Sequence, residues 1–138
     1  MRTGQSTRAA TGFCLLVLVG ACSTEPPPDI IAAEGVVRGQ VTRAPGIPVP
    51  DAWVVLDGLY PLRHGGTQPV YDSTRTDTAG RYSATLGVLN LPDTLVSYSM
   101  RIWPPAASGL APDESEGLGL YLSWQRPDTV VMNIELSP

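Results

Sequence analysis

The sequence is poor in the side chains that most metal and catalytic sites need. It has no lysine, a single histidine, His64, and two cysteines, Cys14 and Cys22, which both stand near the N-terminus. One histidine and no cysteine beyond residue 22 are too few nitrogen and sulfur ligands for an ordinary zinc site. The sequence also contains no Gly-x-Ser-x-Gly nucleophile motif and no glycine-rich phosphate-binding motif. We therefore expect no metal and no cofactor.

Basic charge is scarce as well. Nine arginines stand against thirteen acidic residues in the chain of 138 residues, and the net charge is −4. Residues 22–138 alone carry seven of the arginines and all thirteen acids, a net charge of −6. Because nucleic-acid binding needs a basic face that neutralises phosphates, we expect no nucleic-acid partner.

The one long apolar run lies at the N-terminus. Arg2 and Arg8 are followed by the mostly apolar residues 9–21. These 13 residues are too few to cross a hydrocarbon core of about 30 Å as a helix. A short basic segment before a short apolar one is typical of a secretory signal peptide. We predict that residues 1–21 are such a peptide.

The signal peptide ends in Val19-Gly20-Ala21-Cys22, which resembles the lipobox of bacterial lipoproteins. The resemblance implies that Cys22 is acylated and becomes the first mature residue, because the thiol is the nucleophile that this chemistry needs. It also implies an anchor in membrane lipid at the cell envelope, and Ser23 favours the outer membrane, on its periplasmic or surface face. An ordinary signal peptide cut near Ala21 is the alternative.

Residues 22–35 are predicted to form a proline-rich tether. The Pro-Pro-Pro run at 26–28 favours an extended polyproline conformation, which would hold the following domain off the bilayer. Alternatively, Ile30 and Ile31 belong to a first strand.

Residues 36–138 are predicted to form one all-β domain. Fourteen prolines and fourteen glycines in the chain suit short strands with many turns, and apolar residues alternate with polar ones. We predict a seven-stranded antiparallel β-sandwich, in which each sheet buries one face. Its strands are expected at residues 36–42, 52–57, 70–76, 81–86, 94–103, 118–124 and 129–136, with long loops at 58–69 and 106–116.

The clearest turn lies at residues 77–80. Asp77 suits the first position of a turn, where its carboxylate accepts backbone N–H groups. Gly80 suits a position with positive φ, which strains other residues. Tyr82 then begins the inward-facing positions of the next strand.

Three short pieces of the sequence together resemble the carboxypeptidase regulatory-like domain. They are Val37-x-Gly39-x-Val41-Thr42, Pro48-Val49-Pro50-Asp51-Ala52-Trp53-Val54-x-Leu56 and Thr76-Asp77-x-x-Gly80-x-Tyr82. The resemblance covers residues 36–103 and extends more loosely to 136. It implies a seven-stranded sandwich of transthyretin or prealbumin type and an accessory module without a reaction of its own. The long loop between the second and third strands, at 58–69, departs from the family pattern, and the closing strands carry no motif of the family.

Two exposed aromatic residues are the candidates for ligand binding. Alternation in residues 52–57 places Ala52, Val54 and Leu56 in the core, and Trp53, Val55 and Asp57 on the outer face. The same argument turns Tyr121 outward. Trp53 and Tyr121 could stack on sugar rings; the alternative is that each packs under a loop or closes an end of the sandwich.

The sequence therefore predicts a membrane-anchored envelope lipoprotein whose non-catalytic β-sandwich serves as a binding or structural accessory module. Its partner would be an envelope protein or a glycan, apart from the membrane lipid at Cys22. One alternative is a carbohydrate-binding module that uses the exposed aromatics, and another is a small hydrolase built on His64. The acidic group Asp113, Glu114 and Glu116 lacks EF-hand spacing, and we expect a solvated loop there rather than a calcium site.

Overall fold

The structure, a computed structural model, describes residues 32–138. The predicted signal peptide, Cys22, and the tether up to residue 31 lie outside the described residues. Within residues 32–138, no helix is long and apolar enough to span a membrane.

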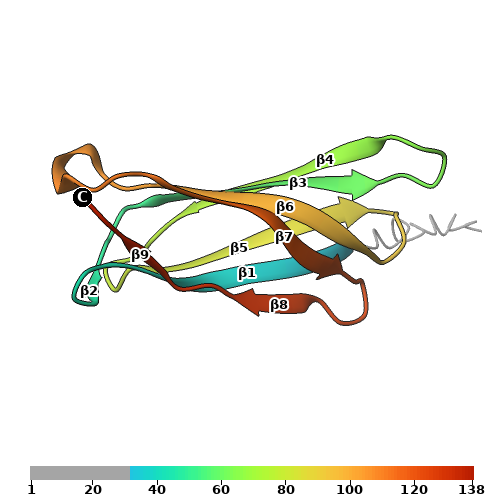
Figure 1. Ribbon diagram of the computed structural model, residues 1–138. Helices are drawn as coiled ribbons and strands as arrows, with labels where there is room; N and C mark the ends of the chain where they lie inside the picture. The colour runs from blue at the N-terminus through green and yellow to red at the C-terminus, as the bar shows by residue number, and fades with distance from the viewer. Residues whose placement is uncertain (1–31) are drawn as a thin grey trace, which may run out of the picture.

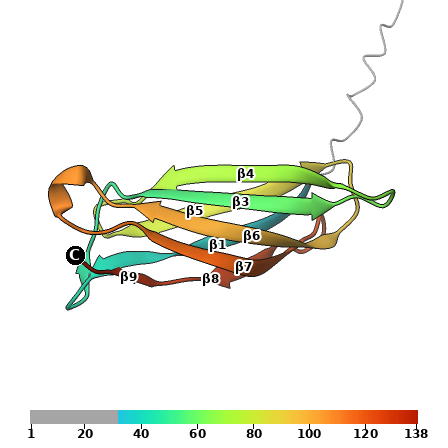
Figure 2. The same cartoon turned by 45° about the horizontal axis from the view of Figure 1, so that its top comes forward.

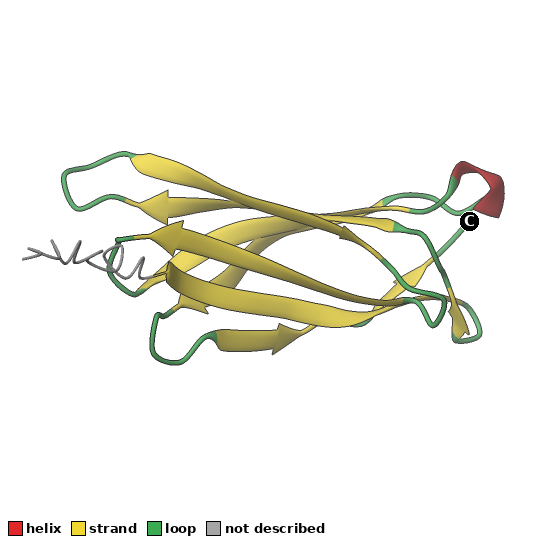
Figure 3. Ribbon diagram, turned by 180° about the vertical axis from the view of Figure 1, so that it is seen from behind, coloured by secondary structure: helices red, strands yellow, loops and turns green. Residues whose placement is uncertain are grey.

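Two β-sheets pack face to face, which confirms the prediction of an all-β sandwich (Figure 1). The four-stranded sheet has the order β4 (Thr67–Arg75), β3 (Trp53–Pro61), β6 (Thr94–Trp103), β7 (Asp113–Leu122). The five-stranded sheet is built around β1 (Ala32–Arg43), which pairs with β2 (Ile47–Pro48), β5 (Arg81–Leu89), β8 (Asp128–Val131) and β9 (Ile134–Leu136). A single 3-10 turn, η1 (Ala106–Ser108), interrupts this strand-rich pattern within the described residues (Figure 3).

Residues 32–138 form nine strands where seven were predicted. The last predicted strand, 129–136, is divided into β8 and β9, and the short β2 was not expected. Both β8 and β9 pair with β1 in parallel, whereas the prediction was antiparallel throughout. After β7 the chain crosses to the other sheet and runs beside β1 in the same direction. Between β8 and β9, the Met132 N–H donates to the Arg38 carbonyl at 2.8 Å. A Cβ on Gly39 would overlap the Met132 carbonyl, so this crossing requires glycine in β1.

Four strands extend into segments that were predicted as tether or long loop. β1 begins at Ala32, so the last four residues assigned to the tether are part of a strand. β3 and β4 extend into the expected loop 58–69 and leave a short hairpin connection between Pro61 and Thr67. Pro69 did not prevent this because β4 is an edge strand, where a missing backbone donor is tolerated. β7 begins at Asp113, inside the expected loop 106–116.

The core lies between the sheets and follows the predicted alternation. Ala52, Val54 and Leu56 are fully buried. Val55 is on the outer side, as predicted, yet only 5% of it is exposed. Its cross-strand neighbours Ser73 and Arg101 flank it on β4 and β6. The buried residues of the other strands include Val37, Tyr82, Ala84, Leu86, Val96, Tyr98, Met100, Ile102, Leu120 and Leu122.

The turn between β4 and β5 confirms its predicted chemistry. Asp77 Oδ1 accepts the N–H groups of Ala79 at 2.9 Å and Arg81 at 2.8 Å. Gly80 has φ of 71°, and a Cβ there would overlap the Val41 carbonyl oxygen of β1. The turn therefore needs glycine for its backbone conformation and also for its close approach to the neighbouring strand.

Candidate functional site

The outer face of the four-stranded sheet carries a pair of tryptophans. Trp53 of β3 and Trp103 of β6 are direct cross-strand partners, although they are 50 residues apart in the sequence. Their side chains are 37% and 41% exposed. Because directly opposite residues point to the same side of a sheet, the two indoles are neighbours on one surface. We call them the tryptophan pair.

An arginine lies over each ring of the tryptophan pair. The guanidinium carbon of Arg75 is 4.8 Å from the Trp53 ring centroid, and that of Arg101 is 5.6 Å from the Trp103 ring centroid. Both distances suit a cation–π interaction. A ligand that stacks on either indole must therefore share the ring with a guanidinium group, so neither tryptophan is a bare aromatic platform.

Carboxylates hold both arginines in place. Arg75 Nη1 is 2.7 Å from Asp51 Oδ1, and Arg101 Nη2 is 3.2 Å from Asp57 Oδ2. Arg101 Nε also lies 3.7 Å from Glu114 Oε1 on β7. Surface ion pairs of this kind contribute little stability, about 0 to 1 kcal/mol each. Their effect here is to position the guanidinium groups over the rings, and the three carboxylates outnumber the two arginines.

Beside these ion pairs lies a shallow hollow of about 290 Å³. Its polar lining comes from Asp57, Glu116, Ser97 and Ser99, and Leu59 adds an exposed apolar surface. Carboxylates and hydroxyls are the groups that hydrogen-bond to polyols. Ser97 and Ser99 alternate with the buried residues of β6, and this alternation is a weak sequence signal for the hollow.

Tyr121 is exposed, as predicted, but it lies far from Trp53. It stands opposite Leu95 at the start of β6, while the tryptophan pair lies at the end of that strand. The eight residue steps between Leu95 and Trp103 correspond to about 26 Å at a rise of about 3.3 Å per residue. The two predicted ligand-binding residues share one face of one sheet and do not form one site.

The acidic residues at 113–116 lie on the edge strand β7 rather than in a mobile loop, which corrects the sequence prediction. Asp113 and Glu114 are adjacent in the strand, so their side chains point to opposite faces. Glu114 contacts Arg101, as described above. Across residues 32–138, no three His, Cys, Asp or Glu side chains are grouped closely enough to hold a metal ion.

His64 lies in the β3–β4 hairpin connection and is exposed. The hollow beside it, about 330 Å³, is lined mainly by apolar groups: Tyr60, Pro61, Leu62, Leu91 and Pro92, with Arg63, His64 and Gly65. No serine, threonine or carboxylate is among these lining residues. The hollow beside His64 thus offers neither a nucleophile nor a carboxylate to orient the imidazole.

Two buried tyrosines complete the ionisable groups of interest. Burial raises the pKa of Tyr82, and the nearby Tyr98 raises it further. Burial also raises the pKa of Tyr98, with a smaller contribution from Asp128. The Tyr82 hydroxyl donates to the Met132 carbonyl at 2.8 Å, which ties the β8–β9 crossing to the core. Both phenols stay neutral donors at ordinary pH, which suits a structural role better than acid–base catalysis.

Comparison with known proteins provides no family assignment. No family model matches the chain, and no curated protein matches it. The N-terminal sequence motif and the surfaces described above are therefore the features that indicate a function.

Proposed function

We propose that this chain is a lipid-anchored protein of the bacterial cell envelope whose β-sandwich is a non-catalytic binding or structural module. The observation that carries the proposal is the lipobox-like sequence Val19-Gly20-Ala21-Cys22 behind a short apolar segment. Each buried acyl methylene contributes roughly 0.8 kcal/mol, so two or three chains on Cys22 would hold the protein firmly in a membrane. Ser23 favours the outer membrane as the destination.

The finer fold assignment is also part of the proposal: a sandwich of transthyretin or prealbumin type, similar to the carboxypeptidase regulatory-like domain. What supports it is that the motif residues have structural roles. Gly39 and Gly80 stand where a side chain would overlap backbone, and Asp77 and Tyr82 hydrogen-bond to backbone groups. Residues that shape turns and core are what that resemblance implies.

The anchor is tested by metabolic labelling of the full chain with a palmitate analogue, followed by membrane fractionation. We expect the wild type to be labelled and to sediment with membranes, and Cys22→Ser to lose both properties. Cys14→Ser is the matched control and keeps both. Labelling that survives in Cys22→Ser, or an unlabelled wild type, would refute the anchor.

A second candidate function is carbohydrate binding on the outer face of the four-stranded sheet. The tryptophan pair lies on the same face as the hollow that Asp57 and Ser99 line, which provides aromatic surface beside polyol-binding groups. Stacking on one indole contributes about 0.5 to 1.5 kcal/mol, so Trp53→Ala should weaken binding by roughly two- to ten-fold.

The test is a glycan array followed by titration with the best ligand. Trp124→Ala, which changes an exposed tryptophan in the β7–β8 loop, is the matched control and should bind as the wild type does. Circular dichroism checks that each variant is folded. Flat titrations of the wild type on all polysaccharides would remove this candidate and leave the anchor proposal untouched.

A further inference from the structure

The outer face of the five-stranded sheet carries two arginines on neighbouring strands. Where β1 pairs with β5, Arg38 stands opposite Ser83, and Gln40 stands opposite Arg81. Both arginines are exposed. Because Ser83 and Arg81 are two positions apart in β5, they point to the same side of the sheet. Arg38 and Arg81 are therefore diagonal neighbours on one surface, within reach of each other's long side chains.

A shallow hollow of about 290 Å³ lies between these two arginines. It is at the place where β8 ends and β9 begins, on the side of β1 that faces away from β5 (Figures 1 and 2). We call it the arginine hollow. Its lining residues are Arg38, Gly39, Gln40, Arg81, Tyr82, Val131 and Asn133.

The charge of the two arginines is not neutralised by the protein. Neither Arg38 nor Arg81 forms an ion pair within residues 32–138, although eleven acids stand against seven arginines in this part of the chain. Like charges on neighbouring strands repel each other and destabilise the pairing. The two arginines on the other sheet, in contrast, are both held by carboxylates. A bound anion would relieve the repulsion in the arginine hollow.

Hydrogen bonds to the backbone fix the polar groups around the hollow. Asn133 Oδ1 accepts the Gln40 N–H at 3.0 Å, so the amide nitrogen Nδ2 is the group that Asn133 can offer to a ligand. Gln40 Nε2 donates to the Ala79 carbonyl at 2.8 Å, and the Tyr82 hydroxyl is used within the core. No carboxylate is among the lining residues. The side chains that can contact a ligand are thus mostly hydrogen-bond donors, which suits an oxyanion.

The two nearest aspartates are directed away from the hollow. Asp77 Oδ1 accepts two backbone N–H groups of its own turn, which holds the carboxylate there. Asp128 pairs with Gly35, three positions before Arg38 in β1. An odd number of positions reverses the side of a strand, so Asp128 leaves the sheet on the side opposite to Arg38.

Two glutamates share the outer face of this sheet with the arginines but lie further along it. Glu34 stands four positions before Arg38 in β1, and Glu135 of β9 is paired with the position four residues after it. Four positions correspond to about 13 Å at a rise of about 3.3 Å per residue. This exceeds the Debye length of about 8 Å at physiological ionic strength, so both glutamates are largely screened from the hollow.

We propose that the arginine hollow binds a phosphate group, either free phosphate or the phosphomonoester of a sugar. The guanidinium groups of Arg38 and Arg81 would each contact phosphate oxygens, and Asn133 Nδ2 would donate to a further oxygen. A phosphomonoester carries nearly two negative charges at neutral pH, which two guanidinium groups match and a carboxylate does not. The proposal goes beyond the anchor and the glycan site, because the hollow lies on the other sheet.

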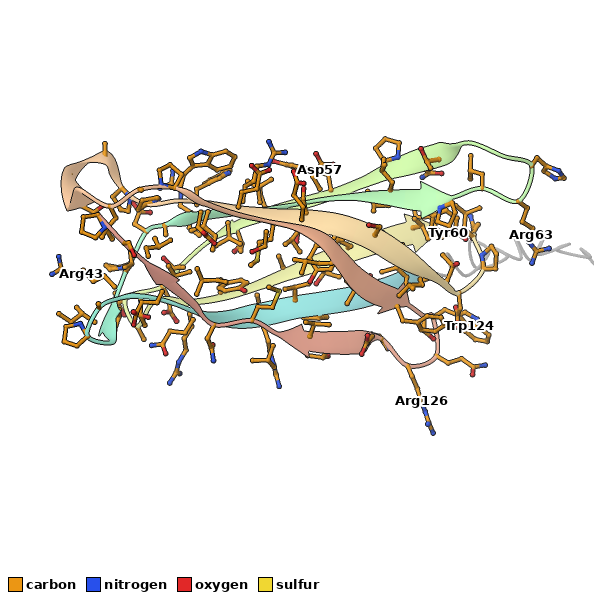
Figure 4. All side chains as sticks on the ribbon, viewed as in Figure 1. Arg43, Asp57, Tyr60, Arg63, Trp124 and Arg126 are labelled. Carbon is orange, nitrogen blue, oxygen red and sulfur yellow. The ribbon has the colours of Figure 1, made fainter. Side chains whose placement is uncertain are left out.

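The test observes the arginine side chains directly. The full chain, labelled with nitrogen-15 in arginine and purified in a neutral detergent, is titrated with inorganic phosphate near pH 8 and followed by NMR. We expect the Nε–H signals of Arg38 and Arg81 to shift together and to saturate. Arg126 is the control, because it extends from the β7–β8 loop at the end of the sandwich and does not line the hollow (Figure 4). Its signal should not move.

The source of the phosphate group is identified by two further ligands. Glucose 1-phosphate should shift the same two signals, and glucose should shift neither. Tighter binding of glucose 1-phosphate than of inorganic phosphate would assign the hollow to a phosphomonoester. Equal binding would assign it to the phosphate group alone.

Three variants separate a built site from general charge attraction. Arg38→Lys keeps the charge but loses the planar fork, and it should weaken phosphate binding by roughly ten-fold. Asn133→Asp keeps the oxygen that accepts the Gln40 N–H but replaces the donor with a negative charge, so saturable binding should disappear. Arg126→Lys makes the same change as Arg38→Lys outside the hollow and should bind as the wild type does. Circular dichroism checks that each variant is folded.

Three results would overturn the proposal. The first is a wild-type chain in which phosphate produces no saturable shift of Arg38 and Arg81. The second is equal weakening by Arg126→Lys and Arg38→Lys, because the attraction would then come from charge in general. The third is acetate that competes with phosphate at equal concentration, because it would show that the hollow does not select a dianion. The outcome of the Cys22→Ser labelling experiment has no bearing on any of these results.

Discussion

The buried phenol of Tyr82 predicts how the stability of the domain depends on alkaline pH. The Tyr82 side chain is buried, and its hydroxyl donates to the Met132 carbonyl at 2.8 Å. The pKa of Tyr82 in the folded protein is raised above the ordinary value of about 10, mainly by burial. As the pH rises, the unfolded chain therefore loses this proton before the folded chain does. The contribution of Tyr82 is complete below about pH 10 and is lost progressively above it.

The magnitude follows from linkage. For a tyrosine that stays protonated in the folded state, a rise of one pH unit above its pKa in the unfolded chain lowers the free energy of unfolding by about 1.4 kcal/mol. The Tyr82 hydroxyl is only part-buried, so we reduce this to roughly 1 kcal/mol at pH 11. Tyr82→Phe removes this loss, but it also removes one hydrogen bond, worth about 1 kcal/mol at neutral pH.

We expect the difference in melting temperature between the wild type and Tyr82→Phe to shrink as the pH rises. In a soluble chain that begins at Ser23, the wild type should melt about 4 to 8 °C above Tyr82→Phe at pH 8, and the two should melt together near pH 11. The absence of lysine helps, because no lysine side chain titrates in this range. Urea unfolding at each pH provides the free energies.

An exposed tyrosine provides the control. Tyr71 is 63% exposed on β4, so Tyr71→Phe should keep a constant offset from the wild type at every pH. A gap for Tyr82→Phe that is the same at pH 8 and pH 11 would show that burial of the phenol does not couple to folding, and the reasoning would fail.

Two further predictions concern the turns that the sequence motifs form. Gly80→Ala should destabilise the domain by about 2 kcal/mol or more, because it strains a positive φ and meets the Val41 carbonyl, whereas Gly46→Ala, at a positive φ in open space, should cost about 1 kcal/mol. Equal costs in urea unfolding would contradict this account of the close approach. Thr76→Val should cost about 2 kcal/mol, since the buried hydroxyl both accepts a backbone N–H at 2.8 Å and donates to a carbonyl at 2.7 Å, and Thr76→Ser should recover most of the loss. A serine variant as unstable as the valine variant would show that the methyl group, rather than the hydroxyl, matters.

The local pattern of the sequence determined the strands, their faces and one turn. Alternation at successive residues identified Ala52, Val54 and Leu56 as core and turned Trp53 and Tyr121 outward, because side chains in a strand point to opposite sides with a period of two. The turn at Asp77 and Gly80 was equally predictable, since both residues act on backbone groups within a few positions in the chain. The predictions for Cys22 and the signal peptide depend on the sequence alone.

The ends of the strands were harder to predict from the sequence. Proline and glycine in the segment 58–69 predicted a loop, but pairing of β3 with β4 extended the hairpin through it. The acidic residues at 113–116 favoured a solvated loop, and pairing with β6 made them part of an edge strand. In both places the hydrogen bonds of a neighbouring strand outweighed the local preference, which is weak for strands.

Only the tertiary structure decided which distant residues meet. Trp53 and Trp103 became neighbours through the register of β3 against β6, and the same register separated Trp53 from Tyr121. Arg75 of β4 likewise meets Trp53 of β3 only through the pairing of the two strands, whereas Arg101 lies over Trp103 because residues two positions apart in one strand point to the same side. Alternation fixes the side of the sheet to which a residue points, but the order and register of the strands fix its neighbours, and these depend on the packing of the whole sandwich.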